Sequence, residues 1–274
     1  MLRSPPPPFM GRAAESQNLR EALARRESLL ISGPAGIGKM ALVMEVLNSL
    51  PSPLARSAIY LSGEDGLQSF LRSLLRRLYE TGDITLRRQL HGEGIRKGTF
   101  HPWLKSLSTS RLRGSLYRSA EQAHYSIVLD HMPPVTHAVA KVVKELVQMR
   151  NTPVYILARG PSEAEIGQVT GLYWSDRQRL PLGPLSEKAA RDLLEWCIRC
   201  FGLARLNLTD FREQVLKLSG RIPGALIQMC ALAAEPRYHY GAQIKTKLIH
   251  IDSLVRGYDP LPPLKPAEAA DDGR

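Results

Sequence analysis

The residues best suited to chemistry form the stretch SGPAGIGKM, which begins at Ser32. Gly33, Gly38 and Lys39 have the spacing of the pattern G-x-x-x-x-G-K-[ST]. In this pattern backbone N–H groups surround a phosphate, the lysine reaches the β- and γ-phosphates, and the final hydroxyl binds Mg²⁺. Here Met40 replaces that hydroxyl with a thioether. The stretch therefore predicts a nucleotide-binding loop that lacks one metal ligand. The nucleotide contacts expected in it are Gly33, Pro34, Ala35, Gly36, Ile37, Gly38, Lys39, Met40 and Ala41.

The residues around the loop support this prediction. The apolar run 28–31 precedes the loop and suits a buried strand, and residues 41–50 repeat apolar side chains at helical spacing. A helix that starts directly after the loop points its N-terminus at the bound anion. The alternative is a glycine-rich turn before an ordinary helix, which the order of strand, loop and helix disfavours.

A second candidate is the stretch SIVLDH, in which an apolar strand ends at Asp130. A carboxylate at this position can hold Mg²⁺ directly or through water, so Asp130 is the expected metal ligand. Rapid ATPases often carry a second acid at the next position, where this chain has His131. A neutral imidazole can accept a proton near pH 7, which makes His131 a catalytic candidate. The alternative is a hydrogen-bonded surface histidine.

The elements that must position these residues follow from periodicity. Apolar runs at 28–31, 58–61, 125–129 and 154–158 alternate with helical patterns at 41–50, 67–79 and 135–149. This alternation predicts a parallel α/β sheet with right-handed crossovers. From residue 186 onward the pattern predicts helices alone, and residues 80–102 show no assignable pattern.

Composition bounds the class of protein. A chain of 274 residues with 43% hydrophobic content can bury one large core, or one core and a small satellite. The N-terminus has no apolar segment of the signal-peptide type, and no apolar run is long enough to span a membrane. Cys197 and Cys200 form a C-x-x-C within a helical pattern without a second ligand pair, so a buried helix face is favoured over zinc or redox chemistry. We therefore expect a soluble, cytoplasmic protein with no membrane partner.

At this point an ordered series of short stretches resembles the AAA+ and STAND-type P-loop ATPases, as in bacterial AAA-family ATP-binding proteins. FMGRAAE resembles their N-terminal box, which closes over adenine, and this implies that Gly11 and Arg12 contact the nucleotide. SGPAGIGK is similar to their Walker A motif and SIVLD to their Walker B motif. VYILARG resembles their sensor-1 strand and places Arg159 where the γ-phosphate is sensed. SGRIPGAL resembles the turn of their helical lid, with Arg221 and Pro223 as further candidates.

The resemblance implies a parallel five-stranded sheet of the additional-strand type, with the sensor strand between the two Walker strands, followed by a small helical lid. ATP or ADP with Mg²⁺ would bind at their junction, with Lys39, Asp130 and Arg159 as catalytic residues. It also implies assembly into a homo-oligomer on ATP binding, or with a partner protein. Met40 and His131 depart from the pattern, and losing one polar group at such a site costs on the order of 10²–10³ in rate. We therefore expect ATP binding with slow hydrolysis.

The expected organisation combines the periodicity with the resemblance. Its parts are a flexible Pro-rich N-terminus (1–8), a P-loop core (9–184) with a basic insert at about 72–118, a helical lid (185–235), a basic C-terminal helix (236–258) and a disordered tail (259–274).

Charge suggests what the protein binds. The formal net charge is +11, and residues 72–118 hold eleven Lys and Arg residues against three acidic ones, which leaves +8. Tyr79, Phe100, Trp103 and Tyr117 are interleaved with them, and basic residues with aromatic ones suit phosphate neutralisation and base stacking. The alternative is a solvated helical face in an arginine-rich proteome. A second basic stretch, 237–256, has apolar residues at helical spacing and suits a protein partner or the lid as well as nucleic acid.

Three functional hypotheses follow. The favoured one is an ATP-binding AAA+-like switch and slow ATPase in a DNA transaction, such as transposition or mobile-element maintenance, with DNA bound by the basic insert. The first alternative is a STAND-like signalling switch with a protein target and little or no hydrolysis. The second is a P-loop small-molecule kinase, which the lid turn and the Arg159 strand disfavour.

Overall fold

The computed structural model describes residues 7–50, 58–63, 66–122, 125–131, 134–149, 151–173 and 175–256. Most of the predicted Pro-rich N-terminus and all of the predicted disordered tail lie outside these residues. The chain divides into two compact units. The sheet unit comprises residues 12–34 and 38–183, and the helical unit comprises residues 1–11, 35–37 and 184–274.

The sheet unit contains five parallel strands in the order β2-β3-β4-β1-β5. They are β1 (Leu29–Ser32), β2 (Ala58–Ser62), β3 (Ser126–Asp130), β4 (Val154–Ala158) and β5 (Arg179–Pro181). Every residue of β1 and β4 is buried, which explains why these strands are continuous apolar runs rather than alternating ones. The predicted parallel five-stranded sheet is confirmed, and β4, the predicted sensor strand, lies between β1 and β3.

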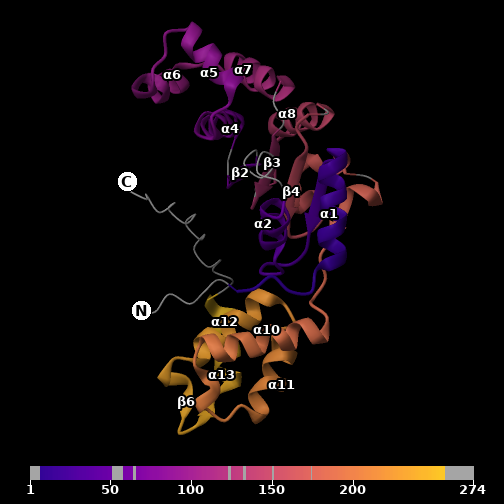
Figure 1. The fold of residues 1–274 in the computed structure, drawn as a ribbon, viewed down its shortest axis with the longest axis vertical. Coiled ribbons are helices and arrows are strands. Elements are labelled where there is room, and N and C mark those ends of the chain that lie inside the picture. Colours follow the sequence, from indigo (N-terminus) through magenta and orange to yellow (C-terminus); the bar gives the residue numbers. More distant parts are fainter. Residues whose placement is uncertain are drawn as a thin grey trace, which may run out of the picture. The chain divides into compact units, whose positions relative to one another are not determined.

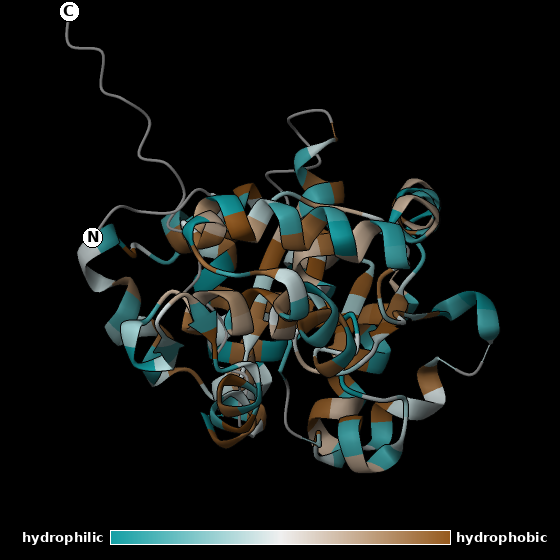
Figure 2. Cartoon of the chain, turned by 90° about the horizontal axis from the view of Figure 1, so that it is seen from below, coloured by the Kyte–Doolittle hydropathy of each residue, from teal (hydrophilic) through white to brown (hydrophobic). Residues whose placement is uncertain are grey.

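One helix precedes the first strand, and others lie between successive strands along the chain. They are α1 (Ala13–Arg25), α2 (Lys39–Asn48), α4 (Leu67–Thr81) and α8 (His137–Gln148). Leu30, Ile127 and Ile156 of the sheet share one hydrophobic core with α4 and α8. Because side chains alternate along a strand, Leu29 and Ile31 point to the other face. Figure 2 shows that the helices carry hydrophobic and hydrophilic residues on different sides.

Between β2 and β3 the chain inserts further helices after α4. These are α5 (Ile84–Gly92), η1 (Lys97–Thr99), α6 (Phe100–Ser106) and α7 (Thr109–Gln122). Figure 1 shows α4 near β2 and α5, α6 and α7 beyond α4, away from the sheet. We call residues 67–122 the insert. The stretch 80–102, which the sequence left unassigned, therefore contains α5, η1 and the start of α6.

A buried carboxylate holds the insert together. Asp83 is 2% exposed and caps the N-terminus of α5, accepting a hydrogen bond from the backbone N–H of Leu86 (2.6 Å). It also accepts hydrogen bonds from the hydroxyls of Ser119 in α7 (2.9 Å) and Tyr125 before β3 (2.6 Å). One side chain thus ties α5 to α7 and to the residue that precedes β3.

The helical unit has its own hydrophobic core, formed by residues such as Leu193, Phe211 and Leu226. Its main helices are α10 (Glu187–Cys200), α11 (Thr209–Leu218), α12 (Pro223–Ala233) and α13 (Thr246–Arg256). Cys197 and Cys200 both lie in α10, with Cys197 buried. Shorter helices within the described residues are α9 (Glu163–Ile166), η2 (Gln168–Leu172), η3 (Asp176–Gln178), η4 (Leu203–Arg205) and η5 (Pro236–Tyr238).

Two expectations for this part of the chain were wrong. The region after residue 186 is not helical alone, because β6 (His239–Tyr240) pairs with β7 (Gln243–Ile244) in an antiparallel hairpin. The helix expected over 236–258 begins only at Thr246. Gly241 explains the difference, because its φ of +58° favours a tight turn over a helix.

None of the helices in the described part of the chain is both long enough and apolar enough to cross a membrane.

Candidate nucleotide-binding site

The loop between β1 and α2 has the backbone that the sequence predicts. Gly33, Gly36 and Gly38 all have positive φ, at +153°, +73° and +98°. Gly38 is the N-cap of α2, which begins at Lys39, so the exposed N–H groups of the first helical turn face the loop. A Cβ placed on Gly38 would meet no atom within 4 Å. The glycine therefore leaves open space at a helix N-terminus, which is what a phosphate group requires.

The side chain of Lys39 is folded into this loop. Its ammonium group donates hydrogen bonds to the carbonyls of Gly33 (2.7 Å) and Pro34 (3.2 Å), and the residue as a whole is 9% exposed. Burial lowers the pKa of Lys39; Asp130 and Glu165 act to raise it, and Arg159 acts to lower it further. An anionic phosphate would satisfy the same ammonium group with charge-assisted hydrogen bonds.

The strand register brings the other candidates to the same edge of the sheet. Ser32, the last residue of β1, pairs with Ala158, the last residue of β4. Asp130, at the end of β3, pairs with Leu157 of β4. Because the strands are parallel, the loop, Asp130 and Arg159 all follow the carboxyl ends of neighbouring strands, where ligands of α/β sheets bind.

The residue after Asp130 contacts it directly. His131 is exposed, and its Nδ1 lies 2.8 Å from Oδ2 of Asp130. His131 has a φ of +49°, which allows the ring to turn back onto the preceding carboxylate. Its catalytic use stays a prediction.

The donor set fits Mg²⁺ bound together with a nucleotide. Among the described residues, no group of three or more His, Cys, Asp or Glu side chains could hold a metal by itself. Mg²⁺ usually keeps several waters and binds one or two carboxylates plus substrate phosphates. Asp130, which is largely buried, can supply that carboxylate, whereas the soft thioether of the half-buried Met40 is a poor ligand for a hard cation.

Glu165 lies near enough to this site to act on it by charge, and the sequence did not reveal it. It lies in the short helix α9 after β4, and its charge reaches Lys39 strongly enough to affect the pKa of the lysine. It also lies close to the backbone of Gly160, where an added Cβ would be 3.6 Å from its Cγ. No spacing rule connects a residue seven positions beyond a strand to the loop, so only the fold could identify it.

The two N-terminal candidates have different surroundings. Arg12 of the sheet unit is buried, donating hydrogen bonds to Glu15 (2.9 Å) and to the carbonyl of Gly183 (2.6 Å). Gly11 of the helical unit has a φ of +68°, and a Cβ there would come within 2.4 Å of the Cβ of Ala189 in α10. Contact of either residue with the nucleotide stays a prediction.

The helical unit includes the tip of the loop. The backbone N–H of Gly224, next to Pro223 at the start of α12, donates a hydrogen bond to the carbonyl of Gly36 (3.0 Å). Arg221 precedes this helix with a φ of +58°, and its carbonyl accepts a hydrogen bond from Leu185 (3.1 Å). Its backbone thus forms the turn after α11, and a role for its side chain at the γ-phosphate stays a prediction.

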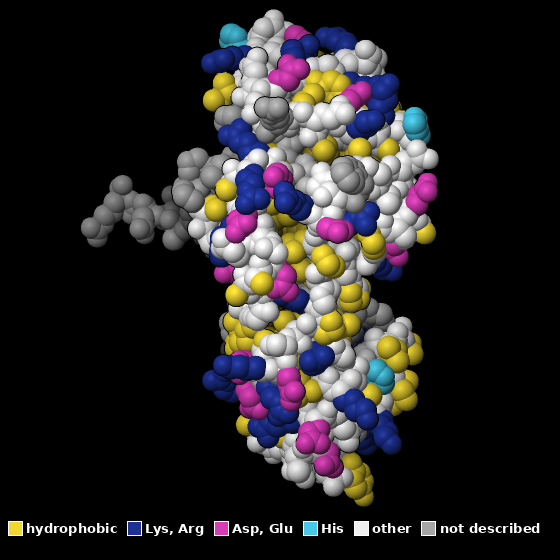
Figure 3. Space-filling model, turned by 90° about the vertical axis from the view of Figure 1, so that its right-hand side faces the viewer, with side chains coloured by type: hydrophobic (Ala, Val, Ile, Leu, Met, Phe, Trp, Pro, Cys, Tyr) yellow, Lys and Arg dark blue, Asp and Glu magenta, His cyan; other side chains and the backbone are white. Residues whose placement is uncertain are grey.

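The insert displays its basic residues to solvent. Figure 3 shows Lys and Arg side chains spread over the molecular surface, and the insert contributes many of them. Arg72 and Arg113 are partly buried; the exposed ones are Arg76, Arg77, Arg87, Arg88, Arg96, Lys97, Lys105, Arg111 and Arg118. Of the three acidic residues among them, Asp83 is buried, Glu80 pairs with Arg77, and Glu93 pairs with Arg111. The surface of the insert is therefore strongly positive.

The interleaved aromatic residues do not serve as a stacking surface, which corrects that part of the sequence prediction. Phe100 and Trp103 are buried in the insert, and Tyr79 stacks on Phe100 with ring centroids 3.9 Å apart. The hydroxyl of Tyr117 donates to Glu145 in α8. Phe100 and Trp103 belong to the core, and Tyr79 and Tyr117 pack against it, because a small helical layer needs large side chains to bury enough apolar area.

Comparisons with known proteins agree with this geometry. A family model described as an AAA ATPase domain matches residues 8–158. The Walker-type ATPase paby2304 of Pyrococcus abyssi is similar in structure, with a TM-score of 0.57, 14% identity, and 92% of this chain and 75% of that chain covered. The Orc1 protein of Aeropyrum pernix, solved in complex with DNA, is also similar in structure, with a TM-score of 0.59 and 14% identity. The match covers 92% of this chain and 67% of that chain.

Cdc6p of Pyrobaculum aerophilum has a TM-score of 0.58 and 12% identity, with 85% of this chain and 63% of that chain covered. At such identities these likenesses show a common fold. The chain thus spans between 63% and 75% of the length of these proteins. No curated protein matches the sequence.

Proposed function

The chain belongs to the AAA ATPase domain family, and on this basis we propose that it is an ATP-binding switch that hydrolyses ATP slowly and acts on DNA. The observation that carries ATP binding is the loop. Gly38 leaves room at the N-terminus of α2, and the ammonium group of Lys39 is already directed into the loop. Both features suit the phosphates of a nucleotide.

Slow hydrolysis rests on the metal side of the site. Bound Mg²⁺ would neutralise the charge that develops on the transferred phosphoryl group. Asp130 would hold it, directly or through water, while Met40 offers no oxygen ligand. Lys39 and the loop amides would still bind the phosphates, so affinity persists while the barrier to hydrolysis is higher.

DNA binding rests on the insert. Its exposed arginines and lysines outnumber the acidic residues beside them, and such a surface binds phosphates by releasing counterions. The buried positions of Phe100 and Trp103 remove stacking on bases as a contribution. We therefore expect salt-dependent binding with little sequence preference. The solved complex of the Aeropyrum pernix Orc1 protein with DNA gives this proposal a precedent on the same fold.

The test measures binding of a labelled DNA duplex by fluorescence anisotropy at several salt concentrations. The variant Arg88→Ala/Lys97→Ala removes two exposed charges of the insert. Each lost phosphate contact should reduce the slope of log K against log salt by about 1. The matched control Arg25→Ala/Lys188→Ala removes two exposed charges from α1 and α10 and should leave the slope unchanged. Equal slopes for both variants would remove the insert from the proposal.

The same samples test the switch. ATP hydrolysis is measured with and without the duplex, and DNA that acts through the switch should change the rate. If the protein binds ATP but neither binds DNA nor changes its ATPase rate in the presence of DNA, the proposed ATP-binding switch stands and the proposed action on DNA is wrong.

A further inference from the structure

The outward face of α13 carries an unusual run of aliphatic side chains. The exposed fraction is 42% for Leu248, 56% for Ile251, 68% for Leu254 and 81% for Val255. Their spacing places these four side chains on one side of the helix. The opposite side packs into the helical unit through Thr246 and Ile249, which are buried. A surface helix normally turns polar residues outward, and a contiguous apolar stripe there indicates an interaction site.

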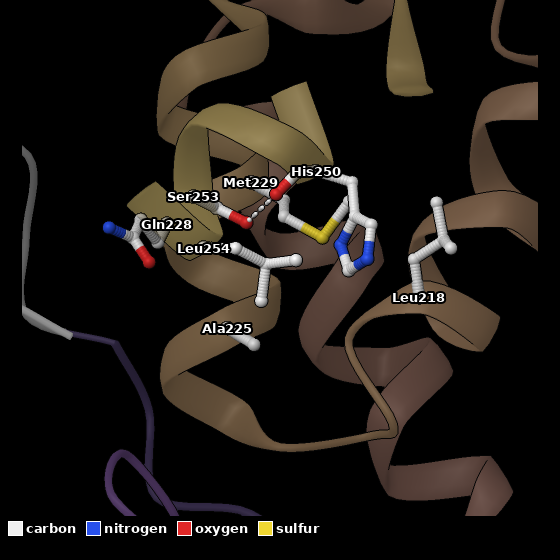
Figure 4. Close-up of a pocket in the computed structure, with 7 residues that line it drawn as sticks. All are labelled: Leu218, Ala225, Gln228, Met229, His250, Ser253 and Leu254. Carbon is white, nitrogen blue, oxygen red and sulfur yellow. Dashed lines mark hydrogen bonds between the residues drawn. The ribbon is translucent and has the colours of Figure 1, made fainter. Parts of the chain in front are cut away.

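A hollow lies beside this stripe. Its volume is about 140 Å³, and it is lined by Leu218 at the end of α11, by Ala225, Gln228 and Met229 of α12, and by His250, Ser253 and Leu254 of α13. Figure 4 shows Leu254, Ala225 and the sulfur of Met229 around it. An enclosed aliphatic cavity of roughly 150 Å³ accommodates a benzene molecule. This hollow has a similar volume but is open to solvent on one side, and its apolar lining offers space for one large apolar side chain.

The charged residues around the stripe are predominantly basic. Lys245 and Lys247 precede the stripe and Arg256 follows it, and all three side chains are exposed. Asp252 is the acidic residue of α13, and its carboxylate already accepts a hydrogen bond from the hydroxyl of Tyr238 (2.6 Å). A ligand of this face must therefore offer apolar side chains together with negative charge.

We propose that this face of α13 and its adjacent hollow bind an acidic amphipathic helix of a partner protein. Such a helix lays its apolar side chains along the stripe, inserts one of them into the hollow, and directs its carboxylates at the flanking lysines and arginine. The hollow favours a protein over an anionic membrane surface, because a bilayer offers no discrete anchor. The apolar centre of the face disfavours nucleic acid, whose contacts are dominated by phosphate.

The test uses the full chain and a defined probe. The probe is a fluorescein-labelled synthetic peptide of about five helical turns, with Leu on one face and Glu on the others. A peptide of identical composition in scrambled order tests the need for an amphipathic helix, and phosphatidylserine vesicles test the membrane alternative. We expect saturable binding of the amphipathic peptide, weaker binding of the scrambled one, and no comparable binding of vesicles.

Two variants locate the binding surface. Ile251→Glu/Leu254→Glu should weaken binding by about tenfold or more, as expected for central anchor contacts. The control Tyr240→Glu changes a side chain that is 76% exposed in the β6–β7 hairpin, outside the stripe, and should leave binding unchanged. All three positions are exposed, so circular dichroism and the melting temperature should match the parent protein.

A third variant tests the charges. Lys247→Glu/Arg256→Glu should reject the acidic peptide and gain affinity for an equivalent peptide in which Lys replaces Glu. The proposal is overturned if the acidic peptide does not bind, if its scrambled form binds equally well, or if vesicles bind and the peptide does not. It is also overturned if the stripe variant and the hairpin control behave alike.

Discussion

The imidazole of His131 lies against the carboxylate of Asp130, with 2.8 Å between Nδ1 and Oδ2. The contact depends on the left-handed backbone of His131, whose φ of +49° is rare for residues other than glycine. Among the described residues this conformation recurs outside glycine at Arg26 and Arg221. Two of these three strained positions thus fall at candidate site residues, and strained backbone concentrates where structure is held for function.

The first prediction concerns Met40. Replacing it by Thr restores an oxygen where the loop pattern places the Mg²⁺ ligand, so kcat should rise by about 10²-fold while the affinity for ATP changes little. A single-turnover measurement at saturating Mg²⁺ checks this. An ordinary ATPase rate for the parent protein, unchanged in Met40→Thr, would show that the thioether does not slow hydrolysis.

The second prediction concerns the position after Asp130. His131→Glu removes the imidazole that contacts Asp130 and supplies an acid that can orient water. The double variant with Met40→Thr should exceed the product of the single effects, because both positions act on one phosphoryl group. His131→Asn serves as the control, since Asn tolerates the left-handed backbone without adding a base. Equal rates for His131→Glu and His131→Asn would contradict the idea that the missing acid limits turnover.

The third prediction concerns Lys39. Its ammonium group is buried against two loop carbonyls and would exchange them for phosphate oxygens. Hydrogen bonds to charged groups contribute roughly 1.5–3 kcal/mol each, so Lys39→Ala should weaken ATP binding by about tenfold or more. Isothermal titration calorimetry on both proteins gives the comparison. Equal affinities would remove the loop from the proposed ATP site.

Much of the sheet unit could be predicted, because parallel strands leave a simple signal. Residues 28–31 and 154–158 read as continuous apolar runs, and these strands are buried on both faces. The β5 strand was implied by the resemblance but not visible in the pattern, since Arg179–Pro181 is too short to show periodicity. The helices of the insert after α4 were missed because α5 and α6 are short and Gly-rich segments separate them.

Site residues that belong to a sequence motif with a fixed backbone shape could be predicted. Site residues that only the fold brings together could not. Gly33, Gly38 and Lys39 follow from a pattern that demands one backbone shape. Glu165 lies in the separate short helix α9 and acts on Lys39 by charge, and nothing in the sequence indicates that the two are near each other. The aromatic residues of the insert illustrate the opposite error, because composition suggested exposure while the packing of Phe100 required burial.

The fourth prediction concerns the insert. Asp83→Ala removes the acceptor for the Leu86 N–H and for the hydroxyls of Ser119 and Tyr125. Leaving buried donors unpaired costs about 1–3 kcal/mol each, so urea unfolding should show a loss of about 3 kcal/mol. Glu80→Ala is the control, because this acid makes an exposed ion pair with Arg77 that contributes about 0–1 kcal/mol. If the insert binds DNA, Asp83→Ala should weaken DNA binding and leave ATP binding intact. A loss below 1 kcal/mol would show that Asp83 does not hold the insert.

The fifth prediction separates packing from nucleotide contact at Gly11. A Cβ at this position would lie 2.4 Å from the Cβ of Ala189, and the φ of +68° adds roughly 1–2 kcal/mol of strain for any other residue. Gly11→Ala should therefore lower the melting temperature, and Ala189→Gly should partly rescue it by removing the opposing methyl group. The rescue is incomplete, because the backbone strain remains and glycine within a helix costs roughly 0.5–1 kcal/mol. Differential scanning calorimetry measures stability and titration calorimetry measures ATP affinity for the single and double variants. A Gly11→Ala protein that keeps its melting temperature but loses ATP affinity would instead assign Gly11 to the nucleotide.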